Sequence, residues 1–344
     1  MLTVFNLEQQ EEWDSIVRSF KKHDVYWLSG YVKAFKVHGD GEPLLFYYDD
    51  GSTRGINVVM RRDIALDNHF IDKIEEKTYY DLSTPYGYGG WIMEGDEHGR
   101  ALVAYENWIN NNNIVCEFVR FHPMLQNQQF CLGFYDVIQL GEVVHIDLFS
   151  PDTIWSNFAG SNRRKIKKAL SYGVKIYNGR FPIIFSQFRE LYNSTMDKNE
   201  ADDYYYFDES FYKSILDDLP YNSQMFWAQK DDKVIAASII LLENGYMNYH
   251  LSGSYSEFNF VAPTNLLLYE VALWGNANRY KTLYLGGGVG SGEDSLFKFK
   301  RSFYKGDLNR FFIGKKIYNQ DMYDELLSKR EDIINDNYFP QYRG

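Results

Sequence analysis

Residues 285–303 read LGGGVGSGEDSLFKFKRSF: a run of glycines, then two acids, then lysines that alternate with aromatic residues. The glycines follow a predicted strand, TLYLG, but the GxxxxGK[ST] pattern of a phosphate-binding loop is absent. Glu293 and Asp294 open a predicted helix over 293–304, where carboxylates stabilise the positive end of the helix dipole and would repel a phosphate. The glycines therefore predict a turn, and the acids predict a helix start.

Within this helix, Leu296, Phe299 and Phe303 recur at helical spacing, which predicts a buried stripe. Lys298 can face water or a substrate. Lys300 lies between Phe299 and Phe303 and has two interpretations. It is either a cation held beside a functional site or a surface lysine whose stem covers the two rings.

Composition limits the class of protein. The chain has 344 residues, which favours two domains, and its 45% hydrophobic and 24% charged residues are ordinary globular values. The formal net charge of −11 excludes a chain whose overall field gathers nucleic acid, because such a field needs clustered Lys and Arg. A polyanion must therefore meet a local basic patch.

Cysteine usage and the N-terminus suggest a cytoplasmic chain. Only Cys116 and Cys131 are present, without a CxxC pair, so neither a disulfide framework nor a zinc site is supported, and we expect no metal. The start, MLTVFNLEQQEEW, lacks the features of a signal peptide. No stretch reaches the roughly 18 apolar residues that a membrane-spanning helix needs.

The predicted elements follow the same order in both halves: two helices, three antiparallel strands, a helix, a strand and a last strand. Ser150-Pro151 predicts a helix start, and we place the domain boundary there, giving domains 1–150 and 151–344. In the first half the strands are expected at 44–50, 56–62, 78–83, 114–121 and 143–148. In the second they are expected at 226–231, 233–244, 246–252, 282–286 and 309–314, and the helix at 293–304 is extra.

A basic helix opens the second half. In NRRKIKKALSYGV (162–174), five of the six residues from Arg163 to Lys168 are basic, Ser161 is a candidate cap, and Ile166, Ala169 and Leu170 form an apolar stripe. A solvated helix face is the ordinary interpretation of such a run. Because the rest of the chain is acidic, the run is also a candidate contact for phosphate or RNA.

Four stretches together resemble a known family: DLSTPYGYGG (81–90), FVRFHPM (118–124), NRRKIKKALSYGV and the stretch at 285–303. With the element order, they resemble the FemABX peptidyltransferases and their BioF2-like relatives, which are tandem GCN5-related N-acetyltransferase (GNAT) proteins. The resemblance implies an α/β (α+β) fold of two GNAT-like domains, each a mixed, largely antiparallel sheet flanked by helices. It also implies acyl transfer to an amine, with the acceptor held by domain 1–150 and the transfer cleft in domain 151–344.

The resemblance also suggests site residues. Lys300, Tyr249 and His250 are the catalytic candidates, because the corresponding lysine faces the cleft, a tyrosine there contacts substrate, and imidazole titrates near neutrality. For Tyr249 and His250 a packing role is the alternative. Further candidates bind substrate: Lys36, Tyr86, Gly87, Tyr88, Gly89, Arg163, Arg164 and Lys298. The glycines of TPYGYGG lie between a strand and the following predicted helix, where amide groups can bind an anion, although a tight turn explains them too. We expect Arg120 to pair with an acid.

The donor is left open between aminoacyl-tRNA and acyl-CoA, and no cofactor is certain. The stretch HLSGSYSEFNFVAPTN (250–265) lacks a basic, glycine-alternating pyrophosphate loop, which favours the aminoacyl donor. The expected acceptor is a nucleotide-linked or lipid-linked cell-envelope precursor, with tRNA as a partner through the basic patch. The alternatives are an acetyl-CoA-dependent enzyme that modifies an amino sugar of a surface polysaccharide, and a catalytically silent module that binds a nucleotide-sugar or a peptide.

Overall fold

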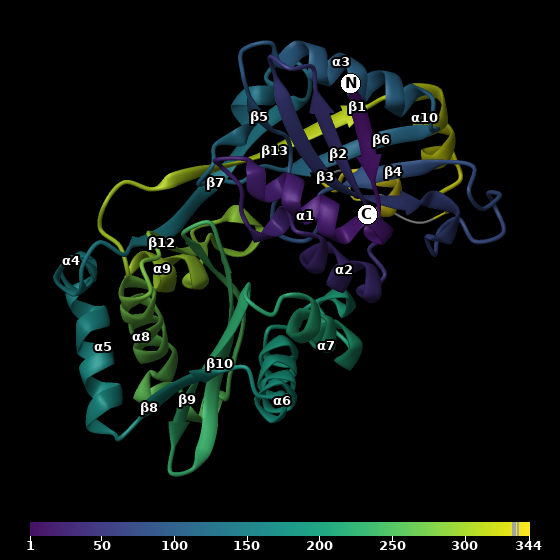
Figure 1. Cartoon of the computed structure of the whole chain (residues 1–344). Coiled ribbons are helices and arrows are strands. Elements are labelled where there is room, and N and C mark those ends of the chain that lie inside the picture. Colours follow the sequence, from purple (N-terminus) through teal and green to yellow (C-terminus); the bar gives the residue numbers. More distant parts are fainter. Residues whose placement is uncertain (332–334, 336) are drawn as a thin grey trace. The chain divides into compact units, whose positions relative to one another are not determined.

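The computed structural model describes residues 1–331, 335 and 337–344. They form two compact units (Figure 1). Unit 1 consists of Met1–Leu140 with Phe311–Gly344, and unit 2 of Gly141–Arg310. These bounds differ from a single division at 150/151, because the end of the chain returns to the first unit.

Unit 1 is built on a mixed sheet in the order β1-β2-β3-β4-β6-β13, with β5 added beside β3. All neighbours are antiparallel except β4 and β6, which are parallel. Asp50 and Gly51 turn the chain between β2 and β3, as predicted. The strands are β1 Leu2–Phe5, β2 Glu42–Asp49, β3 Arg54–Asp63, β4 Tyr80–Ser83, β5 Ile92–Glu94, β6 Ile114–Arg120 and β13 Asn309–Ile317.

The helices of unit 1 bury aromatic and aliphatic side chains against this sheet. On α3, Tyr105 and Ile109 join Phe46 and Leu82 in one core, because they recur on one side of the helix. The α10 residues Tyr323 and Leu326 belong to a second core. The helices are α1 Gln10–Ser19, α2 Ser29–His38, α3 His98–Asn110 and α10 Gln320–Ser328.

Unit 2 contains a second mixed sheet, in the order β7-β12-β11-β10-β9-β8. The pair β11 and β12 is parallel and the other neighbours are antiparallel. The strands are β7 Asp136–Asp147, β8 Lys175–Gly179, β9 Ser223–Lys230, β10 Lys233–Glu243, β11 Tyr246–Ser254 and β12 Thr282–Gly286.

Helices cover both faces of the unit 2 strands. Figure 1 shows α5 and α8 on one side and α6 and α7 on the other. The core on the α8 side takes alternate strand residues such as Ile240, Met247 and Leu283, together with Ile166 of α5 and Leu267 of α8. The helices are α4 Pro151–Asn157, α5 Gly160–Ser171, α6 Pro182–Lys198, α7 Glu209–Asp218, α8 Pro263–Ala277 and α9 Ser295–Arg301.

The last strand of each half pairs outside that half. Residues 144–147 of β7 pair with β12 in unit 2, whereas residues 313–317 of β13 pair with β6 in unit 1. The two halves therefore exchange their final strands. This long-range pairing could not be read from element order.

The predicted fold class, a mixed α/β architecture of sheets flanked by helices, is confirmed. Local signals were accurate: Ser150 caps α4 with Pro151 in its first turn, and Gly173, at φ +73°, follows the end of α5. The predicted cap at Ser161 was wrong. The helix already begins at Gly160 after an extended Ala159, so Ser161 lies inside it.

Candidate active site

The parallel strands β11 and β12 diverge in unit 2. Their ladder runs from Tyr246 opposite Thr282 to Asn248 opposite Tyr284 and has no later pair within the described part of the chain. β11 nevertheless continues to Ser254 along β10. Beyond Asn248 and Tyr284, β11 and β12 therefore no longer pair with each other within the described residues.

His250 lies at this divergence as the extra residue of a β-bulge. The register between β10 and β11 shifts between Ile239 and Ile240, which face Leu251 and Tyr249. Burial lowers the pKa of His250 to about 3. The imidazole is therefore neutral at pH 7 and a weak proton acceptor.

Lys300 reaches the end of β12 from α9. Its side chain is buried, and Nζ donates a hydrogen bond to the carbonyl oxygen of Gly287 at 2.7 Å. Gly286 has φ +81°, and a Cβ placed there would lie 3.3 Å from Nζ, so this glycine makes room for the ammonium group. Burial lowers the pKa of Lys300 to about 8, against a small opposing effect of Asp294. A surface lysine covering two rings is therefore excluded.

The cap of α9 fixes this orientation. Asp294 accepts a hydrogen bond from the backbone N–H of Phe297 at 2.8 Å, and the helix starts at Ser295. Phe297 and Phe303 are buried, whereas Leu296 is 37% exposed, so the predicted stripe through Leu296 was wrong by one position. Lys298 is exposed on the opposite side, and its contact with a substrate stays a prediction.

Tyr249 is half-buried on β11 and packs against the core on the α8 side. Burial raises the pKa of its hydroxyl, which hydrogen bonds with Ser252 and Ser238. The Ser238 hydroxyl also donates to Ser252 at 2.9 Å. Tyr249 is thus a fixed polar group beside the diverging strands.

A second polar group, missed in the sequence, lies on β7. His145 faces Tyr284, the last β12 residue paired with β11. Its Nε2 is 3.6 Å from an Asp147 oxygen, and the Tyr304 hydroxyl donates to the other Asp147 oxygen at 3.0 Å. Nδ1 of His145 is buried and has no hydrogen-bond partner among the described residues. The signal was the HxD spacing in VVHIDL, which places both side chains on one face of a strand.

The glycine loop of unit 1 is packed closed. A Cβ at Gly87 would lie 2.6 Å from the Tyr26 ring, and one at Gly89 would lie 2.8 Å from Thr84. The Gly87 carbonyl accepts from Arg120 at 3.0 Å, and the Gly89 N–H donates to the carbonyl oxygen of Arg120 at 2.9 Å. These contacts give both glycines a packing explanation.

The loop also does not lead directly into a helix. β5 intervenes, and α3 begins only at His98, so the predicted anion site at a helix start is not formed by these glycines. Tyr86 stacks on Phe35 with centroids 5.5 Å apart, and its carbonyl accepts from the Tyr31 hydroxyl. Tyr88 is buried against Tyr26 and Phe311. Substrate contacts of Tyr86 and Tyr88 stay predictions.

Lys36 and Arg120 have partners within unit 1. Lys36 of α2 forms an exposed ion pair with Glu42 at 2.6 Å. Arg120 lies over the Phe311 ring, and in the described part of the chain no ion pair joins it to an acid. The predicted pairing of Arg120 with an acid was wrong. The buried acid near this strand, Asp24, pairs with His122 instead, and its carboxylate lies 3.0 Å from His122 Nε2.

The basic helix α5 buries Asn162, Ile166 and Ala169. Arg163 is half-buried and Arg164 is exposed, and neither forms an ion pair within the described residues. Leu170 is 53% exposed, so its predicted place in the apolar stripe was wrong. It lies one turn after Ile166 but is rotated toward solvent.

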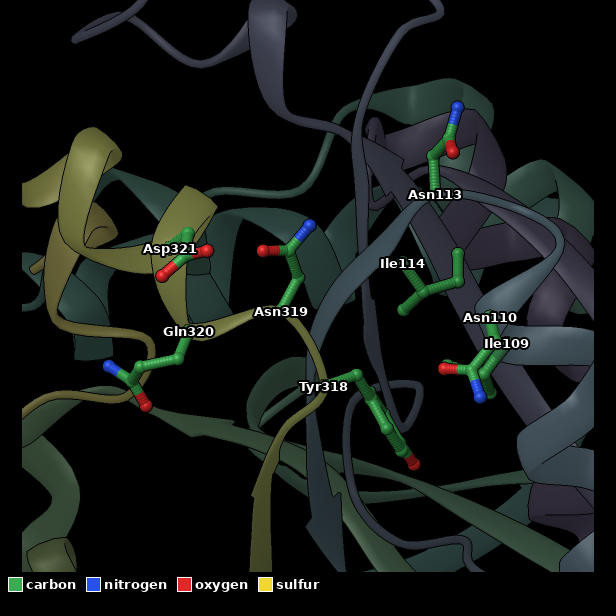
Figure 2. Close-up of a pocket in the computed structure, with 8 residues that line it drawn as sticks. All are labelled: Ile109, Asn110, Asn113, Ile114, Tyr318, Asn319, Gln320 and Asp321. Atoms are coloured by element: carbon green, nitrogen blue, oxygen red, sulfur yellow. The ribbon is translucent and has the colours of Figure 1, made fainter.

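A polar pocket of about 320 Å³ lies in unit 1 and holds none of the predicted site residues. Figure 2 shows its lining at the end of α3, the start of β6 and the junction of β13 with α10. Two lining groups are already used: the Tyr318 hydroxyl donates to buried Glu117 at 2.7 Å, and Asn319 caps α10 through Met322. The lining residues are Ile109, Asn110, Asn113, Ile114, Tyr318, Asn319, Gln320 and Asp321.

Two features are absent from the described residues. No group of three or more His, Cys, Asp and Glu side chains is placed to hold a metal ion there. None of the helices in the same residues has the length and apolar character needed to cross a membrane.

Part of the sequence and the fold of the chain resemble known proteins. Residues 156–301, which include Tyr249, His250 and Lys300, match the acetyltransferase (GNAT) domain. The fold is similar to that of FemX, with a TM-score of 0.67 and 14% identity over 96% of this chain and 100% of that chain. L-PGS from Bacillus licheniformis aligns with a TM-score of 0.55 and 12% identity over 93% of this chain and 95% of that one. No curated protein sequence matches significantly.

Proposed function

We propose that the chain, whose residues 156–301 match the acetyltransferase (GNAT) domain, transfers an acyl or aminoacyl group to an amine of a cell-envelope precursor. The observation that carries the proposal is the buried Lys300 ammonium, 2.7 Å from the Gly287 carbonyl beside the diverging strands. Burying a cation without a paired acid is unfavourable, and groups whose pKa is shifted by such burial are concentrated at functional sites. The FemX-like fold supports a peptide-bearing wall precursor as the acceptor.

Lys300 is the electrostatic group of the proposed reaction. A neutral amine attacks the donor carbonyl, and negative charge develops on the carbonyl oxygen. Collapse of this adduct forms the amide and breaks the ester bond to tRNA, or the thioester bond to coenzyme A, and the leaving hydroxyl or thiol takes up the proton that the amine lost. With a pKa of about 8, Lys300 is mostly protonated at pH 7 and its charge stabilises that oxygen. Gly286 keeps the ammonium close to the end of β12.

His145 is the better candidate to accept the proton that the amine loses. His250, with a pKa of about 3, suits a hydrogen-bonding role. Burial lowers the pKa of His145 as well, but the Asp147 carboxylate opposes that shift by stabilising the imidazolium. Nδ1 of His145 is buried and has no partner in the described residues. Tyr249 contacts the substrate through its hydroxyl.

We propose that the donor is aminoacyl-tRNA and not acyl-CoA. We also propose that the reaction takes place in the cytoplasm. Arg163, which is half-buried on the side of α5, is then a phosphate contact, and Lys298 is a further one. Unit 1 holds the acceptor through Lys36 and the loop from Tyr86 to Gly89. The second candidate is an acetyl-CoA-dependent enzyme on an amino sugar, which the GNAT domain match favours. A catalytically silent binding module is the third.

The test compares Lys300→Met with Lys281→Met, a control in the same unit with an exposed side chain and no assigned role. Purified protein is incubated with labelled aminoacyl-tRNA or acetyl-CoA and a UDP-linked peptide precursor. We expect turnover with aminoacyl-tRNA and a loss of about a hundredfold in Lys300→Met, the usual effect of removing one oxyanion donor. Turnover with acetyl-CoA alone would support the second candidate, and wild-type turnover in Lys300→Met would remove the assignment of Lys300.

A further inference from the structure

The positive charge of the chain is concentrated in one segment of unit 2. Residues 153–189 contain eight Arg and Lys and no Asp or Glu. Without these eight charges the formal net charge of −11 becomes −19 for the rest of the chain. Two of the eight have local partners: Arg180 donates to the carbonyl oxygens of Pro220 and Leu216, and Arg189 lies 3.9 Å from Glu209.

Three of the others form the outward face of α5. At 3.6 residues per turn, Arg164, Lys167 and Lys168 fall on the side opposite the buried Ile166 and Ala169. All three are exposed, and no ion pair neutralises them within the described residues. A cationic face with no internal partner is suited to an external anion.

Apolar side chains are exposed at the C-terminal end of the same helix. Leu170 is 53% exposed and Tyr172 is 46% exposed, and Phe260, from the 3₁₀ turn before α8, is 54% exposed. The rings of Tyr172 and Phe260 meet edge to face with centroids 5.7 Å apart. Lys168 Nζ lies 5.8 Å from the centre of the Tyr172 ring, so the cations begin where the apolar group ends. We call Arg164, Lys167, Lys168, Leu170, Tyr172 and Phe260 the α5 tip.

We propose that the α5 tip docks on the surface of an anionic lipid membrane. Leu170, Tyr172 and Phe260 enter among the headgroups, and Arg164, Lys167 and Lys168 pair with lipid phosphates. Two observations favour lipid over RNA. Leu170 is aliphatic and offers no ring for a base to stack on, and the edge-to-face contact of Tyr172 and Phe260 covers part of the surface that stacking needs. Docking needs neither donor nor acceptor, so its failure is distinguishable from a failure of acyl transfer.

The test is sedimentation of the full chain with vesicles of phosphatidylcholine alone or mixed with an equal part of phosphatidylglycerol. We expect binding only to the anionic vesicles, weakening as salt is added. Arg164→Gln, Lys167→Gln and Lys168→Gln together are expected to lower the partition coefficient about fivefold per cation. Leu170→Ser with Phe260→Ser is expected to lower it about tenfold while its salt dependence remains.

The matched control is Lys22→Gln, Lys77→Gln and Lys198→Gln, which removes three exposed cations elsewhere and should bind as wild type. An equal loss in this control would overturn the docking site, because binding would then follow net charge alone. Absence of binding to anionic vesicles at low salt would also overturn it. So would binding of a structured RNA by a protein that ignores vesicles.

Discussion

The two parallel strand pairs, β4–β6 in unit 1 and β11–β12 in unit 2, stand at the same place in the shared element order and end differently. In unit 1 the contacts continue past Ser83 opposite Phe118, through the Thr84 N–H to the Phe118 carbonyl and a bridge between Gly89 and Phe121. In unit 2 the ladder ends at Asn248 and Tyr284, and within the described chain no later pair follows.

The difference lies in what occupies the strand ends. In unit 1 the loop TPYGYGG fills the place with its own backbone and with the ring of Tyr26. In unit 2 the strand end meets a charged side chain, Lys300. The same topology therefore supports a strand end packed by its own loop in one unit and a strand end that meets a buried lysine in the other, and the side chains decide which.

The largest expected effect tests whether the chain end belongs to unit 1. Arg343 Nε and Arg62 Nε donate to the two oxygens of buried Asp81, each at 2.6 Å. Burial alone would raise the pKa of Asp81, but Arg343 and Arg62 hold it below its usual range. Arg343→Met removes one of the two positive charges that pair with this buried carboxylate. We therefore expect a loss of about 3–5 kcal/mol in the free energy of urea unfolding.

Exposed Lys77→Met is the control for Arg343→Met and should unfold as wild type. Because the folded pKa of Asp81 is lowered, the stabilisation by Arg343 is present above the unfolded pKa of about 4 and is lost as the pH falls below it. Wild-type stability in Arg343→Met would show that the last residues do not complete unit 1.

The next effect compares one glycine at each strand end. Gly87→Ala places a Cβ 2.6 Å from the Tyr26 ring at φ +94°, and we expect a loss of about 3 kcal/mol in unfolding free energy. Gly286→Ala at φ +81° meets only the flexible end of Lys300 and should lose about 1 kcal/mol.

Turnover should respond in the opposite order. Displacement of Lys300 Nζ in Gly286→Ala is expected to lower kcat about tenfold. Folded Gly87→Ala should keep its kcat at saturating acceptor, because Gly87 is proposed to bind the acceptor and does not contact the reacting carbonyl. Urea titration and initial rates measure the two effects. Equal losses of kcat in both variants would mean that the two strand ends do not differ in function.

A smaller effect is the loss of folding stability caused by burying the Lys300 ammonium group. Its pKa is lowered from 10.5 to about 8, so between these values the unfolded chain binds more protons and wild-type stability rises with pH. Lys300→Met should therefore be more stable than wild type by about 1 kcal/mol at pH 7, after the lost hydrogen bond is counted. The advantage should be constant below pH 8 and shrink above it. Urea titrations across pH measure it, and a destabilised variant would contradict the unfavourable burial of the cation.

The smallest effect concerns Lys36. Its ion pair with Glu42 is exposed, so Lys36→Ala should change the unfolding free energy by less than about 0.5 kcal/mol. The variant is consequently suitable for testing acceptor binding by calorimetry, where a weakened affinity for a UDP-linked peptide would support Lys36 as an acceptor contact. Unchanged affinity would remove it.

Most helices and strands could be predicted from local sequence patterns. The strand TLYLG was predicted with the bounds that β12 has, and the turn at Asp50-Gly51 and the helix start at Ser150-Pro151 were also correct. These features depend on a few neighbouring residues. The exchange of β7 and β13 depends on pairing between residues that are 135 to 142 positions apart for β7 and 193 to 201 positions apart for β13, which no local pattern encodes.

The candidate site could be predicted where a residue of suitable chemistry also lies at the helical spacing of buried neighbours. Lys300 was identified from its place between two phenylalanines, but its depth required knowing that the helix starts at Ser295, which turns Phe297 inward with it. His145 was missed because its interest comes from Tyr304, a residue far along the chain that packs on its ring at 4.5 Å. Contacts of this kind are visible only once the chain is folded.

The exchanged strands also set an order of events during synthesis. Unit 2 is one continuous segment, Gly141–Arg310, and holds every strand of its sheet before the chain is finished. Unit 1 must wait, because β6 has no neighbour on one side until residues 313–317 have left the ribosome. Unit 2 can therefore complete its sheet first, and during that interval unit 1 has an unpaired strand edge, which is a feature that favours aggregation.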